Sequence, residues 1–403
     1  MASLVTAMDV RELFHNTFSP CIKRDLSEIL EFFDLYYPLA TRKAELLDAL
    51  ADYLAHYPLD WLGRLPERDV LLLRNLVRAG GGVLSLDYPD YPSVVETIKV
   101  VQSDCTDEHV RKVWLEPEVL DLIAPYVDQI LRENEENMIY PVERLLLGYL
   151  NIYGVIELDR LVDLIAETDY PEGLDAEQVG EMLRESPIVK IYQDYYQEKQ
   201  YFFSPCAMDF DSILESRKVF PEIKDYRRVA WNEALLAGAG APYSCFGTDT
   251  PQYRKLLSML SGLGYPEGEI EKIIHDIAMD AQYSMDEESA ENLFRCVNDK
   301  QDLIPGFDRY RECIDIVVEY ANSVPKWYLS GYSSDEAGLM KISIRVDESY
   351  SGYQGNDEPK RTRVNLYYDS TALSNTSDKV GCAWMIFFKS STEAPKFRRT
   401  VAS

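Results

Sequence analysis

The sequence lacks the patterns that indicate a secreted, membrane or zinc-binding protein. The seven cysteines are spread along 403 residues and no two form a C-x-x-C pair, so their spacing indicates neither a disulfide framework nor a zinc knuckle. The N-terminus has no basic start followed by an apolar stretch, and no apolar run approaches the roughly 20 residues of a membrane span. These absences predict a cytoplasmic protein with free thiols, without a metal, a cofactor or a membrane partner.

Positive charge is also scarce. Lys and Arg number 41 and Asp and Glu number 69, which gives a net charge of −28. Such a surface repels polyphosphate chains and anionic bilayers, so a protein that binds them through a large basic patch is disfavoured. The deficit is uneven: residues 341–403 hold ten basic and seven acidic residues, whereas residues 1–340 carry a net charge of −31. The last part of the chain is therefore a compositionally different piece.

The histidines and glycines do not occur in the sequence motifs that are typical of catalytic or phosphate-binding sites. The four histidines form neither H-x-x-x-H nor H-E-x-x-H; they are His15, His56, His109 and His275. The glycines of 80–82 and 238–242 follow helical patterns, whereas phosphate-binding loops place glycines between a strand and a helix. We therefore predict that the protein is not an enzyme, and that His275 is a surface or boundary residue of an amphipathic helix over 269–281.

Residues 26–54 have the pattern of a helix, an extended segment and a second helix. The first helix, over 26–36, has four apolar residues at helical spacing: Ile29, Leu30, Phe32 and Phe33. Pro38 disfavours helix in the residue before it, and Thr41 is expected to cap the second helix with Glu45 as its partner. The apolar stripe expected on the second helix is Leu46, Leu47, Leu50 and Leu54.

The second helix opens with RKAELL, residues 42–47. This segment resembles the SAP module and its relative, the N-terminal helix–extended–helix unit of transcription terminator Rho. The resemblance implies nucleic-acid binding through basic residues around this helix, which here are Arg42 and Lys43. Asp48, Asp52 and Asp60 follow them and depart from the basic character of those modules.

Two later segments have patterns similar to winged-helix domains. Residues 65–136 predict a helix over 67–78, strands over 97–101 and 110–114, and a helix over 117–131 with a kink at Pro125. This order suits a degraded winged-helix unit, and the polar run RENEEN (132–137) is expected to be a solvated linker. In the second segment, residues 139–204, two helices are expected over 142–153 and 157–167. A third helix is expected to begin after Asp175, which caps it.

A β-hairpin with strands over 188–192 and 200–204 is expected to follow these three helices. In winged-helix proteins that bind DNA, the third helix lies in the major groove. Here that helix carries one arginine, Arg184, against four acidic residues, Asp175, Glu177, Glu181 and Glu185. The acidic third helix predicts protein binding or packing rather than DNA reading.

The remainder of the chain predicts a helical bundle over 207–340, followed over 341–403 by either a small antiparallel β-meander or a partly disordered tail. The segment 322–336 resembles a helix end followed by Trp, Gly and a capped restart, as in uncharacterised bacterial helical proteins. The residues that carry this resemblance are Asn322, Trp327, Gly331 and Ser333. Some of those proteins end in a SEC-C zinc motif, whose cysteines are absent here.

Together these patterns predict a mainly α fold of class α+β with five parts: 1–64, 65–136, 137–206, 207–340 and 341–403. The first functional hypothesis is a bacterial adaptor or regulatory protein that acts through protein–protein contacts. The second is nucleic-acid binding through Arg42 and Lys43 together with basic tail residues, namely Lys360, Arg361, Arg363, Lys396, Arg398 and Arg399. The third is an acidic mimic that occupies the nucleic-acid groove of a partner.

Overall fold

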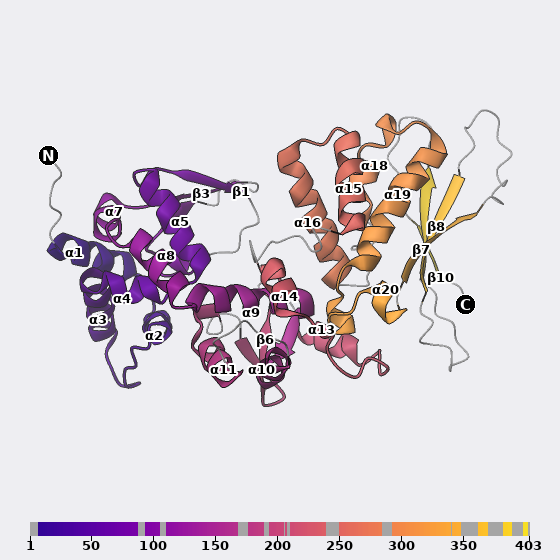
Figure 1. Cartoon of the computed structure of the whole chain (residues 1–403). Helices are drawn as coiled ribbons and strands as arrows, with labels where there is room; N and C mark the ends of the chain where they lie inside the picture. Colours follow the sequence, from indigo (N-terminus) through magenta and orange to yellow (C-terminus); the bar gives the residue numbers. More distant parts are fainter. Residues whose placement is uncertain are drawn as a thin grey trace. The chain divides into compact units, whose positions relative to one another are not determined.

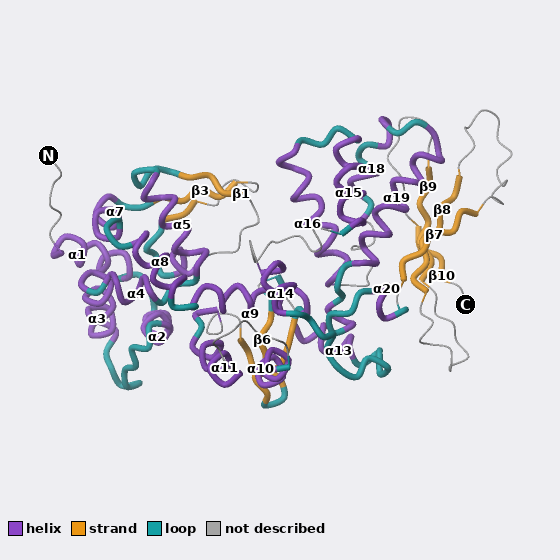
Figure 2. Tube along the Cα trace, viewed as in Figure 1, coloured by secondary structure: helices purple, strands orange, loops and turns teal. Residues whose placement is uncertain are grey.

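A computed structural model describes the chain apart from several segments. The residues outside the description are 1–6, 88–92, 105–109, 168–175, 189–192, 205, 208–209, 239–249, 284–291, 340, 348–361, 370–381, 389–397 and 402–403. Helices dominate and small antiparallel sheets accompany them, which confirms the mainly α, α+β class (Figure 1, Figure 2). The chain divides into two compact units, residues 1–144 with 173–193 and residues 145–172 with 194–403.

The N-terminal unit is built mostly from helices. Its elements are α1 (Ala7–Phe18), α2 (Lys23–Phe32), α3 (Lys43–His56), α4 (Pro58–Gly63), α5 (Glu67–Arg78), β1 (Leu84–Asp87), α6 (Val94–Thr97), β2 (Gln102–Asp104), β3 (Val110–Trp114), α7 (Pro117–Ile123), α8 (Val127–Glu136), the start of α9 (Ile139–Tyr153) and α11 (Ala176–Glu185).

Helix α3 lies at the centre of the first helices. Its predicted stripe is buried, with exposed fractions of 6% or less for Leu46, Leu47, Leu50 and Leu54. Helix α1, which was not predicted from the sequence, packs on α3 and buries Val10, Phe14 and Phe18. These three residues lie four apart, so they form one face of a helix.

The boundaries of the helix–extended–helix segment differ slightly from the prediction. Helix α2 ends at Phe32, and the next residues turn through Asp34, whose φ of 59° is left-handed. The cap of α3 is Arg42, not Thr41, because the carboxylate of Glu45 accepts a hydrogen bond from the backbone N–H of Arg42 at 3.3 Å. The predicted partner is therefore correct and the predicted cap is wrong by one residue.

The first sheet has the strand order β1-β3-β2. Strand β3 has the predicted bounds, but the predicted strand over 97–101 is wrong. There the chain forms α6 and a turn, because Ser93 accepts a hydrogen bond from the backbone N–H of Glu96 and the Glu96 carboxylate accepts one from Ser93. This capping box starts a helix in a valine-rich stretch and overrides its β propensity.

The helix expected over 117–131 is two helices, α7 and α8, which separate around Pro125. The run RENEEN is not a solvated linker, because α8 continues through Glu136. Within this run Asn134 is buried and donates from Nδ2 to the carbonyl of Gly63 at 3.2 Å. A polar residue of low helix propensity is thus retained by a tertiary hydrogen bond.

The C-terminal unit begins within α9 and contains the rest of the chain. Its further elements are β4 (Val155–Glu157), α10 (Leu158–Ala166), β5 (Gln193–Tyr196), β6 (Lys199–Phe203), α13 (Phe210–Arg217), α14 (Trp231–Gly238), α15 (Pro251–Gly262), α16 (Glu267–Tyr283), α18 (Arg295–Asn298), the 3₁₀ turns Gln301–Leu303 and Trp327–Leu329, α19 (Gly306–Ser323), α20 (Ser334–Ala337), β7 (Lys341–Asp347), β8 (Thr362–Asp369), β9 (Cys382–Phe388) and β10 (Arg398–Val401).

The second three-stranded sheet has the order β4-β6-β5, which repeats the first–third–second order of the first sheet. A hairpin is present, and its second strand agrees with the predicted strand over 200–204. Its first strand, β5, lies where a turn was expected, and residues 189–192 of the predicted first strand lie outside the described residues. The two-residue loop of the hairpin is Gln197-Glu198, and both residues have positive φ, 49° and 65°. Positive φ values at both residues define a type I′ turn, which usually contains Gly or Asn. Because the loop here is Gln-Glu, its sequence does not predict a two-residue turn.

Helices α15, α16 and α19 confirm the helical pattern predicted between residues 256 and 322. The tail contains a four-stranded antiparallel meander in the order β10-β9-β8-β7, as predicted for a β-rich tail. Asn322 connects the bundle to this sheet. Its side-chain amide donates to the carbonyl of Ile342 and accepts from the N–H of Ile342, both at 2.9 Å.

Trp327 is among the largest fully buried side chains of the C-terminal unit. It is 1% exposed, and its Nε1 donates to the carbonyl of Asn151 at 2.9 Å. The backbone of Gly154 lies against the ring, so a Cβ built at Gly154 would be 2.3 Å from Cγ of Trp327. Arg217 joins the two segments, since its guanidinium donates to the carbonyls of Trp327 and Tyr153 at 2.9 and 2.6 Å.

We predict that Gly154→Ala lowers the free energy of unfolding by about 3 kcal/mol, because the new methyl group overlaps Trp327 and Gly154 has a φ of +72°. Urea denaturation followed by circular dichroism measures this change. Gly264→Ala is the matched control. Gly264 has a similar φ of +79° with open space around it, so only backbone strain of about 1 kcal/mol is expected. Equal losses in the two variants would contradict the steric account.

Candidate functional site

The N-termini of α2 and α3 lie side by side in the N-terminal unit. The ammonium group of Lys23 donates to the carbonyl of Leu39 at 2.5 Å, and that of Lys43 donates to the carbonyl of Ser19 at 2.8 Å. These two hydrogen bonds connect the segment before α2 with the loop before α3. We call the resulting surface the α2–α3 edge: Ile22, Lys23, Arg24, Tyr36, Tyr37, Leu39, Arg42 and Lys43.

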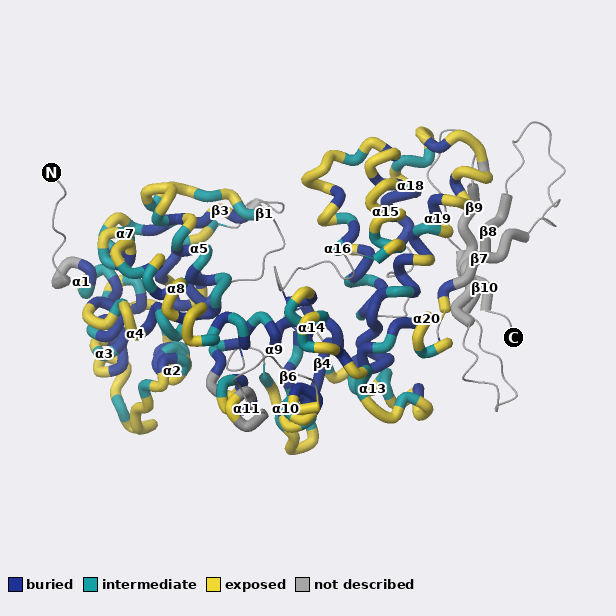
Figure 3. Tube along the Cα trace, viewed as in Figure 1, coloured by how far each residue is buried: buried dark blue, intermediate teal, exposed yellow. Residues whose placement is uncertain are grey.

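Large apolar side chains are exposed along this edge. The exposed fractions are 96% for Leu39, 74% for Tyr36 and 56% for Ile22. Among the described residues, half of the exposed large hydrophobic side chains lie between positions 22 and 59. Four of them belong to the edge, and Tyr57 and Leu59 follow the other end of α3. The exposed loop between α2 and α3 is visible in Figure 3. A single exposed Leu is ordinary, but a cluster of this kind marks an interaction surface.

Two further contacts extend the surface toward α4. The Tyr36 hydroxyl donates to Asp34 at 3.4 Å, and Asp34 forms an ion pair with Arg64 at 2.6 Å. Arg64 also pairs with Asp60, whose carboxylate accepts a hydrogen bond from Tyr53. Burial and the neighbouring Asp60 carboxylate together raise the pKa of Tyr53 far above its usual value. The exposed loop is thus attached to the helical core through polar contacts.

The sequence-predicted cations Arg42 and Lys43 are exposed on this edge. Lys23 and Arg24, at the start of α2, are also exposed there; they were not predicted, because they precede the segment that carries the resemblance. The other predicted cations are elsewhere. Lys360, Arg361 and Lys396 lie outside the described residues, whereas Arg363 is in β8 and Arg398 and Arg399 are in β10, which belong to the C-terminal unit.

The aspartates of α3 were expected to oppose an anionic ligand. Asp48 and Asp52 both bind the guanidinium of Arg11 on α1, and His15 lies 3.7 Å from Asp48. Hydrogen bonds to these two carboxylates raise the pKa of Arg11. Part of the negative charge on α3 is therefore balanced by α1, a helix that was not predicted from the sequence.

The predicted third helix of the winged-helix-like segment is α11. Leu183 on this helix is buried, and Glu181 and Arg184 are exposed. Asp175 lies outside the described residues. In the hairpin that follows, Tyr195 is 68% exposed, while Tyr201 packs edge-on to Tyr196, so the aromatic residues only partly face the hairpin's own core. Lys199 there forms an ion pair with Glu157 at 2.7 Å.

Two buried carboxylates among the described residues of the N-terminal unit have pKa values shifted in the direction expected of a catalytic acid. Burial raises the pKa of Glu143 well above its usual value and also raises that of Asp69. Glu143 accepts from the N–H of Glu67 at 2.9 Å, and Asp69 accepts from the N–H of Val95 at 3.1 Å. Each carboxylate therefore satisfies a backbone N–H in the first turn of a helix, α5 or α6, which is a structural role.

Lys326 in the C-terminal unit is also strongly perturbed. It is 1% exposed, and burial lowers its pKa to about 7. Its ammonium group donates to the carbonyl of Ala321, in the last turn of α19. A lysine at this position donates a hydrogen bond to a helix carbonyl that has no partner within the helix. When protonated, it also interacts favourably with the negative end of the helix dipole.

His275 on α16 is partly buried, as expected for a boundary residue, and burial lowers its pKa. Four cysteines of the described residues are free thiols, Cys21, Cys206, Cys296 and Cys313, and burial raises the pKa of Cys296 to about 12. Within the described part of the chain, no group of three His, Cys, Asp or Glu residues is arranged to hold a metal ion. No described helix has the length and apolar character needed to cross a bilayer.

Comparisons of the chain with protein-family models, with curated proteins and with solved structures find no match.

We predict that Glu143→Gln makes the unfolding free energy less dependent on pH. The raised pKa means that folded Glu143 keeps a proton at pH values where the unfolded chain has lost it. The wild-type chain therefore loses stability as pH rises from the usual glutamate pKa toward the raised value. Glutamine keeps the acceptor oxygen for the N–H of Glu67 and cannot ionise, so this loss disappears.

Urea denaturation at about pH 5 and about pH 8 measures the difference. The variant is expected to gain stability over the wild type at the higher pH. Glu28→Gln, at an exposed position of α2, is the control and should leave the pH dependence unchanged. If Glu143→Gln retains the wild-type slope, Glu143 does not titrate as proposed.

Proposed function

We propose that this protein is an adaptor or regulatory protein that binds a protein partner through the α2–α3 edge. The observation that carries the proposal is the cluster of exposed Ile22, Tyr36, Tyr37 and Leu39 beside four cations. Tyrosine and other aromatic residues with arginine are enriched in protein interfaces, where they supply contact area and hydrogen bonds. The rigid helices on either side hold the loop that presents them.

The chemistry of the edge defines the partner. Its exposed apolar groups would contact an apolar side chain, and Lys23, Arg24, Arg42 and Lys43 would attract carboxylates around it. The nearby carboxylates of Asp25 and Glu45 are engaged with the backbone N–H groups of Ile22 and Arg42, at 3.3 Å each. The partner that fits is a protein segment with an apolar anchor flanked by acidic residues.

The modular organisation of the chain is part of the proposal. Segment 26–54 is two helices joined by an extended loop, which supports a SAP-like assignment. For segment 137–206 we propose a winged-helix-like order of elements along the chain, in which α11 belongs to the N-terminal unit and the sheet to the C-terminal unit. The second assignment is supported by the chain order helix, strand, helix, helix, strand, strand and by the strand order β4-β6-β5. We propose that both modules serve protein contacts or packing.

Photo-crosslinking tests the partner. A benzophenone side chain at position 39, where Leu39 is 96% exposed, is expected to capture a protein in cells. The captured peptide should contain acidic residues around an apolar one. The control places the same group at Leu303, which is 64% exposed in the C-terminal unit. Capture that is equal at both positions, or that survives the change Tyr36→Ser with Tyr37→Ser, would contradict the proposal.

Nucleic-acid binding at the same edge is the second candidate function. The specific observation in its favour is that four exposed cations surround the N-termini of two helices, which are favourable positions for phosphate. The net charge of −28 opposes it. Binding to few phosphates would be weak and easily abolished by salt.

Fluorescence anisotropy with a short DNA duplex at low salt decides between the two candidates. If nucleic acid is the ligand, Lys23→Gln with Lys43→Gln weakens binding and reduces the salt slope by about 0.9 for each phosphate that the variant no longer neutralises. Lys255→Gln with Lys272→Gln, two exposed cations of the C-terminal unit, is the matched control. No binding by the wild type would remove this candidate and leave the protein-partner proposal intact.

A further inference from the structure

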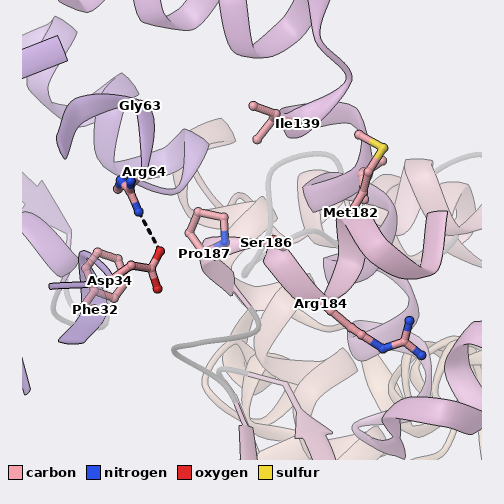
Figure 4. A pocket seen from close by; sticks show the side chains of 10 residues that line it. Phe32, Asp34, Gly63, Arg64, Ile139, Met182, Arg184, Ser186 and Pro187 are labelled. Carbon is pink, nitrogen blue, oxygen red and sulfur yellow. Dashed lines mark hydrogen bonds and ion pairs between the residues drawn. The ribbon is translucent and has the colours of Figure 1, made fainter. Parts of the chain in front are cut away.

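A cleft of about 530 Å³ lies within the N-terminal unit, beside the end of α2. Four segments that are far apart in sequence form its walls: the end of α2 with Asp34, the end of α4 with Arg64, the start of α9, and the end of α11 with Ser186 and Pro187. Figure 4 shows their side chains around the cleft. A cavity of ~150 Å³ is large enough to hold a benzene ring, so this cleft can admit an aromatic or leucine side chain.

The walls of the cleft are mostly apolar. Phe32, Ile139, Val142, Met182 and Pro187 contribute aromatic, aliphatic and thioether surface. All of these except Val142 are half-buried, so an apolar group placed against them would cover surface that water reaches and would gain free energy. Methionine is flexible and polarisable, so Met182 can adapt to the shape of the group that enters.

The charged side chains that line the cleft are either paired or directed away from it. Arg64 forms ion pairs with Asp34 at 2.6 Å, drawn in Figure 4, and with Asp60 at 3.3 Å. The guanidinium of Arg184 points away from the other labelled side chains in Figure 4. A charged group inside the cleft would therefore lose hydration without gaining a counterion. The occupant that suits the cleft is an uncharged apolar group.

The cleft is continuous with the α2–α3 edge through Asp34. One carboxylate oxygen of Asp34 accepts a hydrogen bond from the Tyr36 hydroxyl at 3.4 Å, and the other pairs with Arg64. Leu39 is five residues further along the chain, and its carbonyl accepts from the ammonium group of Lys23. Five residues span at most about 18 Å. An extended partner segment of similar length can therefore reach from the cleft to the cations of the edge.

The edge differs from the cleft in the charge that it offers. Lys23 and Lys43 donate to the backbone carbonyls of Leu39 and Ser19, which are neutral acceptors, so these hydrogen bonds leave the positive charges uncompensated. Arg64 in the cleft, in contrast, has two carboxylates around it. Acidic groups of a partner are therefore attracted to the edge, and an apolar group is favoured in the cleft.

We infer that the cleft receives the apolar anchor residue of the protein partner that covers the α2–α3 edge. This inference rests on the proposed function and deepens it by assigning the two parts of the partner segment to two places. The anchor side chain inserts among Phe32, Ile139 and Met182, and acidic residues within about five positions of it lie against the four cations of the edge. An anchor that fills a pocket in this way supplies a large share of the binding free energy.

Photo-crosslinking from two positions of the full chain tests this division. A benzophenone side chain at position 39 reports on the edge. An aliphatic diazirine amino acid at position 182, close in size to methionine, reports on the cleft without filling it. Both positions are expected to capture the same protein in cells. Mass spectrometry should place the cross-link from position 182 on a segment with a large apolar residue and with acidic residues within about five positions of it.

The outcomes separate this inference from the proposed function. If position 39 captures a protein that does not cross-link to position 182, the inference is overturned and the proposed function stands. If position 39 captures nothing, the proposed function fails and the inference fails with it. A cross-link from position 182 to a second copy of this chain, or to a segment without a large apolar residue, also overturns the inference.

Substitutions of Met182 give an independent test, with capture at position 39 as the readout. Met182→Trp fills the cleft and is expected to lower capture roughly ten-fold, as the loss of an interface anchor does. Met182→Leu keeps the size and the apolar character of the side chain and should retain capture. Met279→Trp is the matched control, because Met279 is also half-buried but belongs to the C-terminal unit. It should leave capture unchanged.

Circular dichroism spectra that match the wild type establish that each variant is folded. If Met182→Trp does not fold, Met182→Gln replaces it, because glutamine is close in size and polar and is expected to lower capture about three-fold. Wild-type capture by a folded Met182→Trp or Met182→Gln would contradict the inference. An equal decrease in Met279→Trp would contradict it as well, since the cleft would then not be the cause.

Discussion

The burial of one face of α3 is the constraint on which the proposed surface depends. Leu46, Leu47, Leu50 and Leu54 lie in the core of the N-terminal unit, and α1 packs on the same helix. Rotation of α3 would expose these leucines, each of which contributes about 1.5–3 kcal/mol when buried. The orientation of the helix is therefore determined. Its start, with Arg42 and Lys43, remains at the surface, where the lysine hydrogen bonds to Leu39 and Ser19 connect it to the start of α2.

In both units, buried polar side chains form hydrogen bonds with backbone groups near helix ends and in loops. In the N-terminal unit, Glu143 and Asp69 satisfy N–H groups at the starts of α5 and α6. In the C-terminal unit, Lys326 satisfies a carbonyl near the end of α19, and Arg217 binds the carbonyls of Trp327 and Tyr153. Ionisable side chains that would resemble catalytic residues in isolation are thus engaged with backbone atoms. These hydrogen bonds give each of the groups a structural role in the described part of the chain.

Sequence patterns predicted the secondary structure correctly where the local periodicity agrees with the tertiary packing. The bounds of α5 and β3 were predicted correctly, as were the leucine stripe of α3 and the helical pattern of α15, α16 and α19. Prediction failed where another interaction decides the outcome. The capping box of Ser93 and Glu96 forms a helix in a valine-rich stretch, and the hydrogen bond of Asn134 to Gly63 retains a polar run in α8. The turn at Gln197-Glu198 uses positive φ without glycine.

The candidate site was only partly visible in the sequence. Arg42 and Lys43 were identified through the resemblance to SAP modules, but Lys23 and Arg24 join them only through the hydrogen bonds between the two helix starts. The exposure of Tyr36, Tyr37 and Leu39 could not be predicted from the sequence, because apolar residues in a loop can be buried or exposed according to the tertiary packing around them. The cleft near Ser186 combines four distant segments, and only the folded chain brings them together.

A partner that covers the α2–α3 edge in the cell is the central claim. Hydroxyl-radical footprinting of the chain in cells and of the purified chain tests it most directly. We expect Tyr36, Tyr37 and Leu39 to be protected from oxidation in cells, while the exposed controls Tyr195 and Leu303 react equally in both samples. Equal oxidation of the edge in cells and in the purified chain would contradict the claim.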